Sequence, residues 1–221
     1  MMKIMIHACN KRMHYVNGFL IPQLIRTGID QDDVIVWQDK QDCGCLKAYM
    51  DAYRSLPEEG DTWHLEDDVL PGQLFARLVS ELQTIEGIMC GFGSAAYCEG
   101  MHPGLVHRAE EMYYSFPCIR IPNKMIRMFL TWLETARHTQ KYAVRFNENK
   151  HADYLFKQFL AEVIGETRIF NLSPCLVEHV DDYIGGSVAN RKRDVIAKAL
   201  AFDDREALNA LDEWRYAHEK E

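Results

Sequence analysis

The stretch "TWHLEDDVLPG", residues 62–72, places three consecutive carboxylates directly after a short apolar run. The run "TWHL" is typical of a buried β-strand, and Glu66, Asp67 and Asp68 stand where that strand ends. Adjacent carboxylates repel one another, and removing them from water makes the repulsion worse. The triplet is therefore either a solvated turn or the place where something cationic binds.

The segments on either side of this stretch alternate between strand-like and helix-like patterns. Apolar and β-branched runs predict strands at residues 3–8, 34–39, 62–65 and 87–94. Apolar residues at helical spacing predict the intervening helices at 15–28, 46–56 and 73–85. This β-α-β-α-β-α-β order predicts an α/β fold, with a Rossmann-like, mainly parallel central sheet flanked by helices on both faces. Further helices are expected at 123–137, at 153–164 and from about 193 onward.

The composition narrows the classes of function. The chain has 221 residues, 48% of them hydrophobic, and a formal net charge of −8. This charge argues against a general nucleic-acid coat or a membrane-surface protein. The chain shows neither a membrane-spanning apolar run nor the pattern of a signal peptide. The seven cysteines are scattered and odd in number, which favours reduced thiols and a cytoplasmic protein.

The position of the acidic triplet points to a binding site. In an open α/β sheet, ligands collect at the carboxyl ends of the strands, and the triplet is expected at such an end. Converging carboxylate oxygens there suit magnesium or manganese, whose coordination is completed by phosphate and water. The alternative is an acidic helix start, in which Asp68 or a neighbour caps the helix that follows. The triplet alone leaves both interpretations open.

Two motifs resemble the GT-A family of nucleotide-sugar glycosyltransferases, in particular its small bacterial and phage members. "EDD" at 66–68 is similar to the acidic DxD motif that follows a strand in their nucleotide-binding half. "SPCLVEHVDDYIGGSVANRKR" at 173–193 is similar to their C-terminal segment, where a strand ending in His precedes a Gly/Ser-rich, basic loop. "YYSFPCIRIPNKMIRMFLTWLE" at 113–134 resembles their strand followed by an amphipathic helix.

The resemblance implies a single GT-A-like domain over residues 1–221. Its expected parts are a nucleotide-binding half (1–95), a more irregular half that holds the acceptor and completes the metal shell (96–192), and a charged helical tail (193–221).

The resemblance also implies a divalent manganese or magnesium ion. Asp68 is the expected direct ligand, His179 would complete the metal shell, and Glu66 is a further candidate ligand. Glu66 or Asp67 would contact the ribose of the nucleotide or a metal-bound water. From the residues alone, His179 is equally well a hydrogen-bonded histidine at a strand end.

A nucleotide-sugar donor, with a UDP-sugar as the first choice, is expected along the same edge of the sheet. Close backbone N–H groups and positive charges would hold its diphosphate, with an ordinary flexible loop as the alternative, at Gly185, Gly186, Ser187, Arg191 and Lys192. The base and ribose would lie against the ends of the first two strands, at Ala8, Cys9, Asn10, Arg12, Gln38 and Asp39. Asp39 is also a common kind of turn former.

For the general base, the family places a carboxylate near the start of a later helix. "ENKHADYLF", residues 148–156, is the corresponding stretch, with Asp153 as the first choice and Glu148 as the second. Asp153 is an equally good N-cap for its own helix.

These residues predict a metal-dependent hexosyltransferase that acts on a glycan, protein, lipid or modified DNA base. For a phage-type DNA acceptor, "NRKR" (190–193) and the aromatic residues Tyr113, Tyr114 and Phe116 would line the cleft. One alternative is a catalytically degenerate GT-A-like interaction protein whose charged C-terminal helix contacts a partner or a second copy of the chain. Another is nucleotidyl or phosphoryl transfer, although the chain lacks the G-x-x-x-x-G-K-[ST] loop of ordinary kinases and ATPases.

Overall fold

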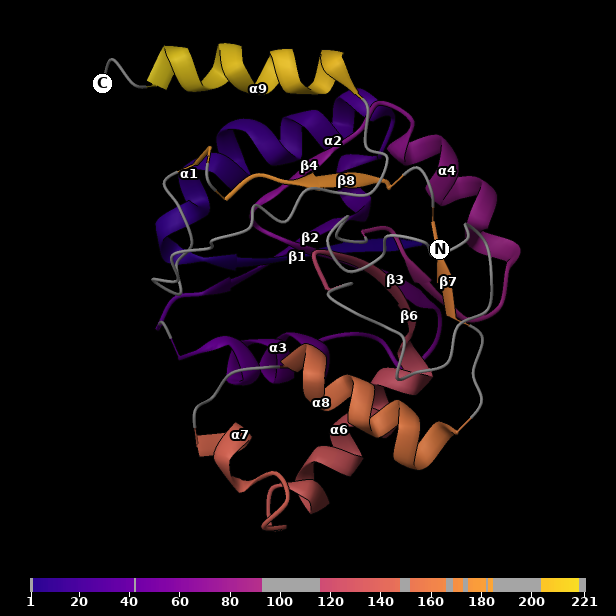
Figure 1. Cartoon of the computed structure of the whole chain (residues 1–221). Helices are drawn as coiled ribbons and strands as arrows, with labels where there is room; N and C mark the ends of the chain where they lie inside the picture. The colour runs from indigo at the N-terminus through magenta and orange to yellow at the C-terminus, as the bar shows by residue number, and fades with distance from the viewer. Residues whose placement is uncertain are drawn as a thin grey trace.

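A six-stranded sheet forms the centre of the molecule (Figure 1). The computed structural model describes residues 2–41, 43–92, 116–147, 152–165, 169–172, 175–181, 183–184 and 204–218. Within them the strands of this sheet are β1 (Lys3–Cys9), β2 (Val34–Asp39), β3 (Asp61–Glu66), β5 (Ile88–Cys90), β6 (Cys118–Pro122) and β7 (Ile169–Asn171). Their order is β2-β1-β3-β6-β5-β7, and only β6 runs against the other described strands of the sheet. The predicted mainly parallel sheet is confirmed.

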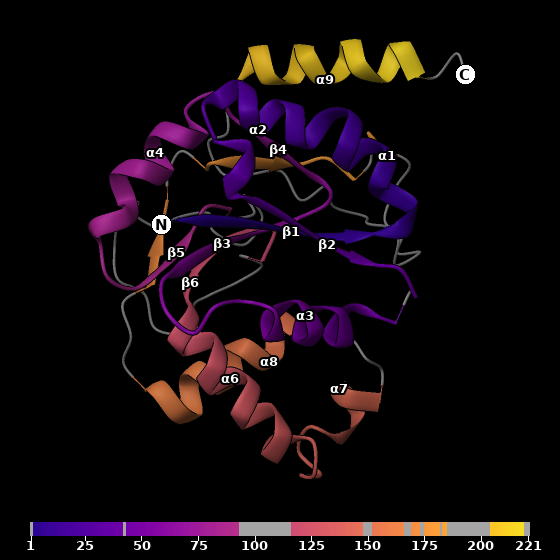
Figure 2. The ribbon, with the colours of Figure 1, turned by 180° about the vertical axis from the view of Figure 1, so that it is seen from behind.

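Helices cover both faces of the sheet, as the two opposite views show (Figures 1 and 2). One face carries a continuous helical run and a second helix: η1 (Asn10–Arg12), α1 (Met13–Tyr15), the π-helical η2 (Val16–Leu20), α2 (Ile21–Thr27) and α4 (Phe75–Glu81). The other face carries α3 (Cys45–Arg54), α6 (Asn123–Ala136) and α8 (Ala152–Phe159), with α7 (Ala143–Asn147) beside them. Short helical turns are η3 (Gln31–Asp33), η4 (Leu82–Thr84) and the π-helical η6 (Leu160–Ile164).

Each face of the sheet has its own hydrophobic core. Along β1, Ile4 and Ile6 pack with the residues of α2 and α4, whereas Met5 packs with those of α3 and α6. A strand buried on both faces must be apolar throughout, which is why β1 reads as an apolar run. The predicted helical stripes are mostly buried as well, but Leu74, which precedes α4, is exposed, and Leu78 and Leu82 are half-buried.

The chain ends in α9 (Arg205–His218), which lies outside α1 and α2 (Figures 1 and 2). Ala207 and Leu211 are buried, and the Trp214 ring packs at 5.4 Å, centroid to centroid, against Tyr15. The apolar face of α9 is thus covered by its own chain. An oligomer formed through this helix stays a prediction and would use the helix's charged face. Among the described residues, no helix is both long and apolar enough to cross a membrane.

The acidic triplet does not begin a helix. The residues that follow it form a short strand, β4 (Val69–Pro71), which pairs antiparallel with β8 (Val177–His179). Val69 lies opposite His179 in this pair. The interpretation of Asp68 as a helix cap is therefore wrong, because α4 begins only at Phe75.

The sheet brings the candidate residues to one edge. In the parallel pairing, Cys9 at the end of β1 lies opposite Asp39 at the end of β2, and His7 lies opposite Glu66 at the end of β3. The β4–β8 pair then places His179 beside the residue that follows the triplet. Residues more than 100 positions apart thereby meet at the carboxyl edge of the parallel strands.

Gly91 ties β5, β6 and the segment before β8 together. Its N–H donates to the Cys118 carbonyl at 2.8 Å, and its carbonyl accepts from the Leu176 N–H at 2.7 Å. A Cβ atom at this position would lie 2.5 Å from the Sγ of Cys118. No side chain fits this close approach.

We expect Gly91→Ala to destabilise the protein by about 1–3 kcal/mol, because the added methyl group overpacks the core. Urea denaturation measures this free energy of unfolding. In a Cys118→Ala background the sulfur is gone, so the same substitution should cost less. An equal cost in both backgrounds would show that the contact with Cys118 is not the cause.

Candidate metal centre

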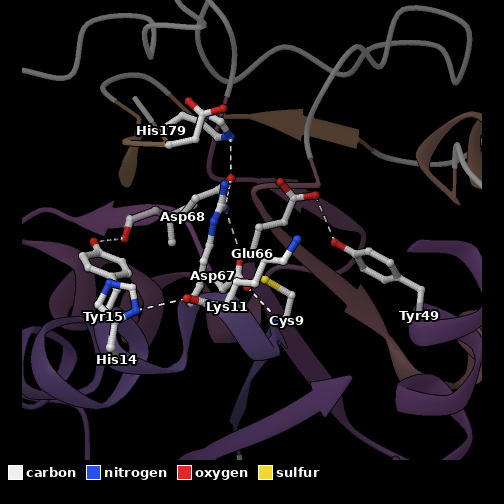
Figure 3. Close-up of polar contacts among 12 residues, drawn as sticks. Cys9, Lys11, His14, Tyr15, Tyr49, Glu66, Asp67, Asp68 and His179 are labelled. Carbon is white, nitrogen blue, oxygen red and sulfur yellow. Dashed lines mark hydrogen bonds and ion pairs between the residues drawn. The ribbon is translucent and has the colours of Figure 1, made fainter. Parts of the chain in front are cut away.

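The three carboxylates of the triplet point in different directions and have different partners (Figure 3). Glu66 reaches α3, where its Oε1 accepts from the Tyr49 hydroxyl at 3.1 Å. Asp67 turns back to β1, and its Oδ2 accepts from the Cys9 N–H at 2.6 Å. Asp68 faces Arg12 and His179. The triplet is therefore three positions with different partners rather than one patch of charge.

Arg12 supplies the positive charge between the two aspartates. Its Nη1 contacts Oδ1 of Asp67 at 3.0 Å and forms a short ion pair with Oδ2 of Asp68. Arg12 is 5% exposed, Asp67 7% and Asp68 6%. The protein thus neutralises part of the triplet's repulsion internally, in a cluster removed from water. The pairing of Arg12 with the triplet was not predicted from the sequence.

His179 lies between two carboxylates, one of which sequence reasoning missed. Its Nε2 is 3.3 Å from Oδ2 of Asp68, and its Nδ1 is 3.1 Å from Oδ1 of Asp181. A metal-binding histidine usually donates its other ring N–H to a carboxylate, which fixes the tautomer and the ring orientation. Asp181 stands in that position. In the sequence, the signal for this role of Asp181 was its position two residues after the candidate ligand His179.

The charges of the cluster shift its pKa values in opposite directions. Burial acts to raise the pKa of Asp68, but His179 and Arg12 outweigh it and hold that pKa well below its ordinary value. Burial acts to lower the pKa of His179, but Asp68 and Asp181 raise it to about 10. Burial, followed by the charge of Asp68, raises the pKa of Glu66 to about 7. Without a metal, His179 is therefore an imidazolium held by two carboxylates.

A buried stack of rings fixes Tyr49, the partner of Glu66. The Tyr49 ring stacks on His7 with 4.1 Å between centroids, and Nε2 of His7 lies 3.0 Å from Nδ1 of His64. Burial lowers the pKa of His7 to about 3. Burial also lowers the pKa of His64 well below its ordinary value, so both rings are neutral and one nitrogen of the pair donates to the other. The Tyr49 hydroxyl is thereby held toward Glu66.

The donor set fits a divalent cation. One ligand atom from each of Glu66, Asp68 and His179 can be chosen so that all three lie within 4.8 Å of one another. Two ligands on opposite sides of a metal are about 4.2 Å apart at ordinary bond lengths of about 2.1 Å, so only a small closure is needed. Oδ1 of Asp68 is buried and has no hydrogen-bond partner among the described residues. Two carboxylates with one imidazole suit manganese better than magnesium, which prefers an all-oxygen shell.

Asp153 lies in the first turn of α8, close enough to Glu66 for its charge to act on that carboxyl group. After the larger effects of burial, Asp68 and His179, the charge of Asp153 also acts to raise the pKa of Glu66. Asp153 sits inside the first turn of the helix, because α8 already begins at Ala152. It is therefore not the N-cap, as one interpretation of the sequence had it. Glu148 lies outside the described residues.

The candidates at the ends of β1 and β2 have varied environments. The Gln38 side chain donates to Oδ1 of Asn10 at 2.6 Å, in an exposed contact. Asp39 accepts from the N–H groups of Gln41 and Cys43, which is the arrangement of a turn former. The methyl group of Ala8 is buried in the core, so only its backbone could meet a ligand. The diphosphate loop candidates lie outside the described residues: Gly185, Gly186, Ser187, Arg191 and Lys192.

The pKa of His179 predicts how stability depends on pH without metal. A histidine whose pKa rises from 6.5 to about 10 on folding stabilises the protein fully below pH 6.5. This stabilisation is lost as the pH rises toward 10. In EDTA, we therefore expect wild-type protein to lose more free energy of unfolding between pH 6.5 and 9.5 than His179→Gln does. Urea denaturation at both pH values measures this difference.

The exposed residue His138 provides the control, since His138→Gln should keep the wild-type dependence on pH. If His179→Gln and wild type lost the same free energy of unfolding over this range, the imidazolium would not be held as described.

No protein-family model and no curated protein matches the chain. Among the solved structures that are similar to it are two transferases. The inositol-1-phosphate CTP transferase from T. maritima has a TM-score of 0.46 and 11% sequence identity, over 97% of this chain and 77% of that chain. The UDP-glucose pyrophosphorylase from Acinetobacter baumanii has a TM-score of 0.39 and 13% identity, over 95% of this chain and 70% of that chain. These values are too low to assign a family or an activity, so GT-A membership stays a prediction.

Proposed function

We propose that this protein is a metal-dependent glycosyltransferase that moves a sugar from a nucleotide-diphosphate donor, first of all a UDP-sugar, to an acceptor hydroxyl. One observation carries the proposal: Glu66, Asp68 and His179 converge at the carboxyl edge of the parallel strands, and one buried oxygen of Asp68 has no partner among the described residues. Ligands of open α/β sheets bind at this edge.

Glu66, Asp68 and His179 would hold a manganese ion, and Asp181 would orient His179 toward it. When bound, the ion would stabilise the negative charge that grows on the departing diphosphate. Asp67 has a different task, because its oxygens already bind the Cys9 N–H and Arg12. It fixes the turn rather than the metal.

The ends of β1 and β2 would bind the nucleoside. Asn10 and Gln38 present one amide pair there, and an amide offers both a donor and an acceptor to the edge of a base. Asp39 is less suited, since its carboxylate is engaged by its own turn. The predicted diphosphate loop at 185–192 stays part of the proposal.

Asp153 is the proposed general base. In the reaction, the acceptor oxygen would form a bond to C1 of the sugar while the bond from C1 to the β-phosphate oxygen breaks. The electron pair of that bond leaves with UDP, and the proton of the hydroxyl passes to the Asp153 carboxylate. A base acting on the acceptor in this way favours inversion at C1.

The need for a base separates glycosyl from nucleotidyl transfer. A sugar phosphate that attacks a nucleoside triphosphate is already ionised, whereas an acceptor hydroxyl must lose its proton. A carboxylate whose charge acts on Glu66, such as Asp153, therefore supports glycosyl transfer. The product distinguishes the two reactions, since glycosyl transfer releases UDP and nucleotidyl transfer releases pyrophosphate.

The acceptor stays open among glycan, protein, lipid and modified DNA base. For a DNA acceptor, Phe116 was predicted to line a cleft, which is wrong because its ring is buried in the core beside Tyr49 and Phe156. Tyr113, Tyr114 and the basic stretch 190–193 lie outside the described residues.

We expect Asp68→Asn to abolish manganese-dependent binding of UDP, because it removes the charge of the central ligand. Isothermal titration calorimetry with UDP, with and without Mn²⁺, measures this binding. Asp51→Asn changes a half-buried aspartate that is ion-paired with Lys47, and this variant should bind as wild type does. If Asp68→Asn bound UDP with the full dependence on Mn²⁺, the proposal that Asp68 holds the metal would be contradicted. If wild-type protein bound no nucleotide, the protein would be a degenerate interaction protein instead.

We expect Asp153→Asn to slow the hydrolysis of a UDP-sugar at least about 100-fold, the usual effect of losing a general base. Binding of Mn²⁺ and UDP should stay as in wild type, since Asp153 is not among the proposed metal ligands. Release of UDP, followed by a coupled assay, gives the rate. A variant with wild-type hydrolysis would exclude Asp153 as the base.

A further inference from the structure

The two oxygens of Asp68 have different surroundings. Oδ2 forms the ion pair with Arg12 and lies 3.3 Å from Nε2 of His179. Oδ1 is equally buried, yet it has no hydrogen-bond partner in the described part of the chain. One oxygen is therefore paired within the protein, and the other has no protein partner among the described residues.

Arg12 is held in place from several sides. Arg12 is the last residue of η1, the short helical turn that directly follows β1. The residue is 5% exposed, and its guanidinium bridges Asp67 and Asp68. Asp67 is itself fixed by the Cys9 N–H. Withdrawing the guanidinium would remove the positive charge between two adjacent buried carboxylates, which is strongly unfavourable. A cation can therefore join Asp68 at Oδ1 while Arg12 stays on Oδ2.

A fixed positive charge beside the ligands weakens the attraction of the site for a free divalent ion. Interactions between charges a few ångströms apart are strong in a cluster from which water is excluded. A negatively charged ligand, such as a diphosphate, can restore the negative charge that Arg12 cancels. Binding of the metal and of the diphosphate then assist each other, and this coupling acts equally in both directions.

We propose that Arg12 is a built-in counter-charge that makes the centre take up a divalent ion together with a nucleoside diphosphate, rather than alone. This inference rests on the proposed function, since it assumes a nucleoside diphosphate at the same edge. Arg12 is thereby assigned to the metal centre, as a residue that sets the coupling between metal and diphosphate binding.

Two substitutions that change the charge of the site in opposite directions test the proposal. Arg12→Met removes the counter-charge, so Mn²⁺ alone should bind at least about tenfold more tightly than to wild type. Asp67→Asn keeps an oxygen for the Cys9 N–H but removes a negative charge, so Mn²⁺ alone should bind more weakly. Arg12→Lys keeps the positive charge, so its Mn²⁺ affinity should lie nearer to that of wild type than the affinity of Arg12→Met does. Electron paramagnetic resonance of free Mn²⁺, with and without UDP, gives the affinities without any enzyme activity.

In wild-type protein, UDP should tighten Mn²⁺ binding at least about tenfold, and in Arg12→Met this enhancement should shrink. Equal Mn²⁺ affinity with and without UDP in wild type, where UDP does bind, would overturn the proposal and leave the proposed function standing. Failure of wild type to bind UDP in the presence of Mn²⁺ would instead defeat the proposed function. If Arg12→Met did not fold, unchanged Mn²⁺ affinity in Asp67→Asn would still overturn the proposal.

Discussion

The buried ion pair of Arg12 with Asp67 and Asp68 is the interaction on which this site depends. It joins the end of β1 to the turn after β3, and it allows two adjacent aspartates to leave water together. Such a cluster is costly to desolvate unless every charge has a partner. The protein supplies partners for most of its oxygens and leaves Oδ1 of Asp68 without one among the described residues. This oxygen of Asp68 is the atom that we propose contacts the metal ion.

Sheet topology explains why these residues meet. The parallel strands β1, β2 and β3 all end at one edge, so their following residues are neighbours. The short β4–β8 pair then brings His179 and Asp181 to the same place from the other end of the chain. The core behind the site is packed on both faces of the sheet, which holds the edge rigid enough to position charged groups.

The sequence predicted the helices and strands better than the contacts between them. Apolar spacing identified the strands and helices because the buried faces repeat with the period of each structure. The triplet and His179 were found because carboxylates and histidine at strand ends are chemically conspicuous. Arg12 was assigned to the nucleotide instead, since its pairing with residues 55 and 56 positions later exists only once β1 and β3 lie side by side. β4 was missed because a three-residue strand has no period to detect.

Anomalous diffraction at the manganese edge, from crystals grown with Mn²⁺ and UDP, tests the proposed metal centre most directly. We expect one strong manganese peak in bonding contact with Asp68 and His179, with Arg12 still paired to the other oxygen of Asp68. A bound nucleotide with no manganese at these residues, or manganese bound elsewhere at the edge of the sheet, would contradict this expectation.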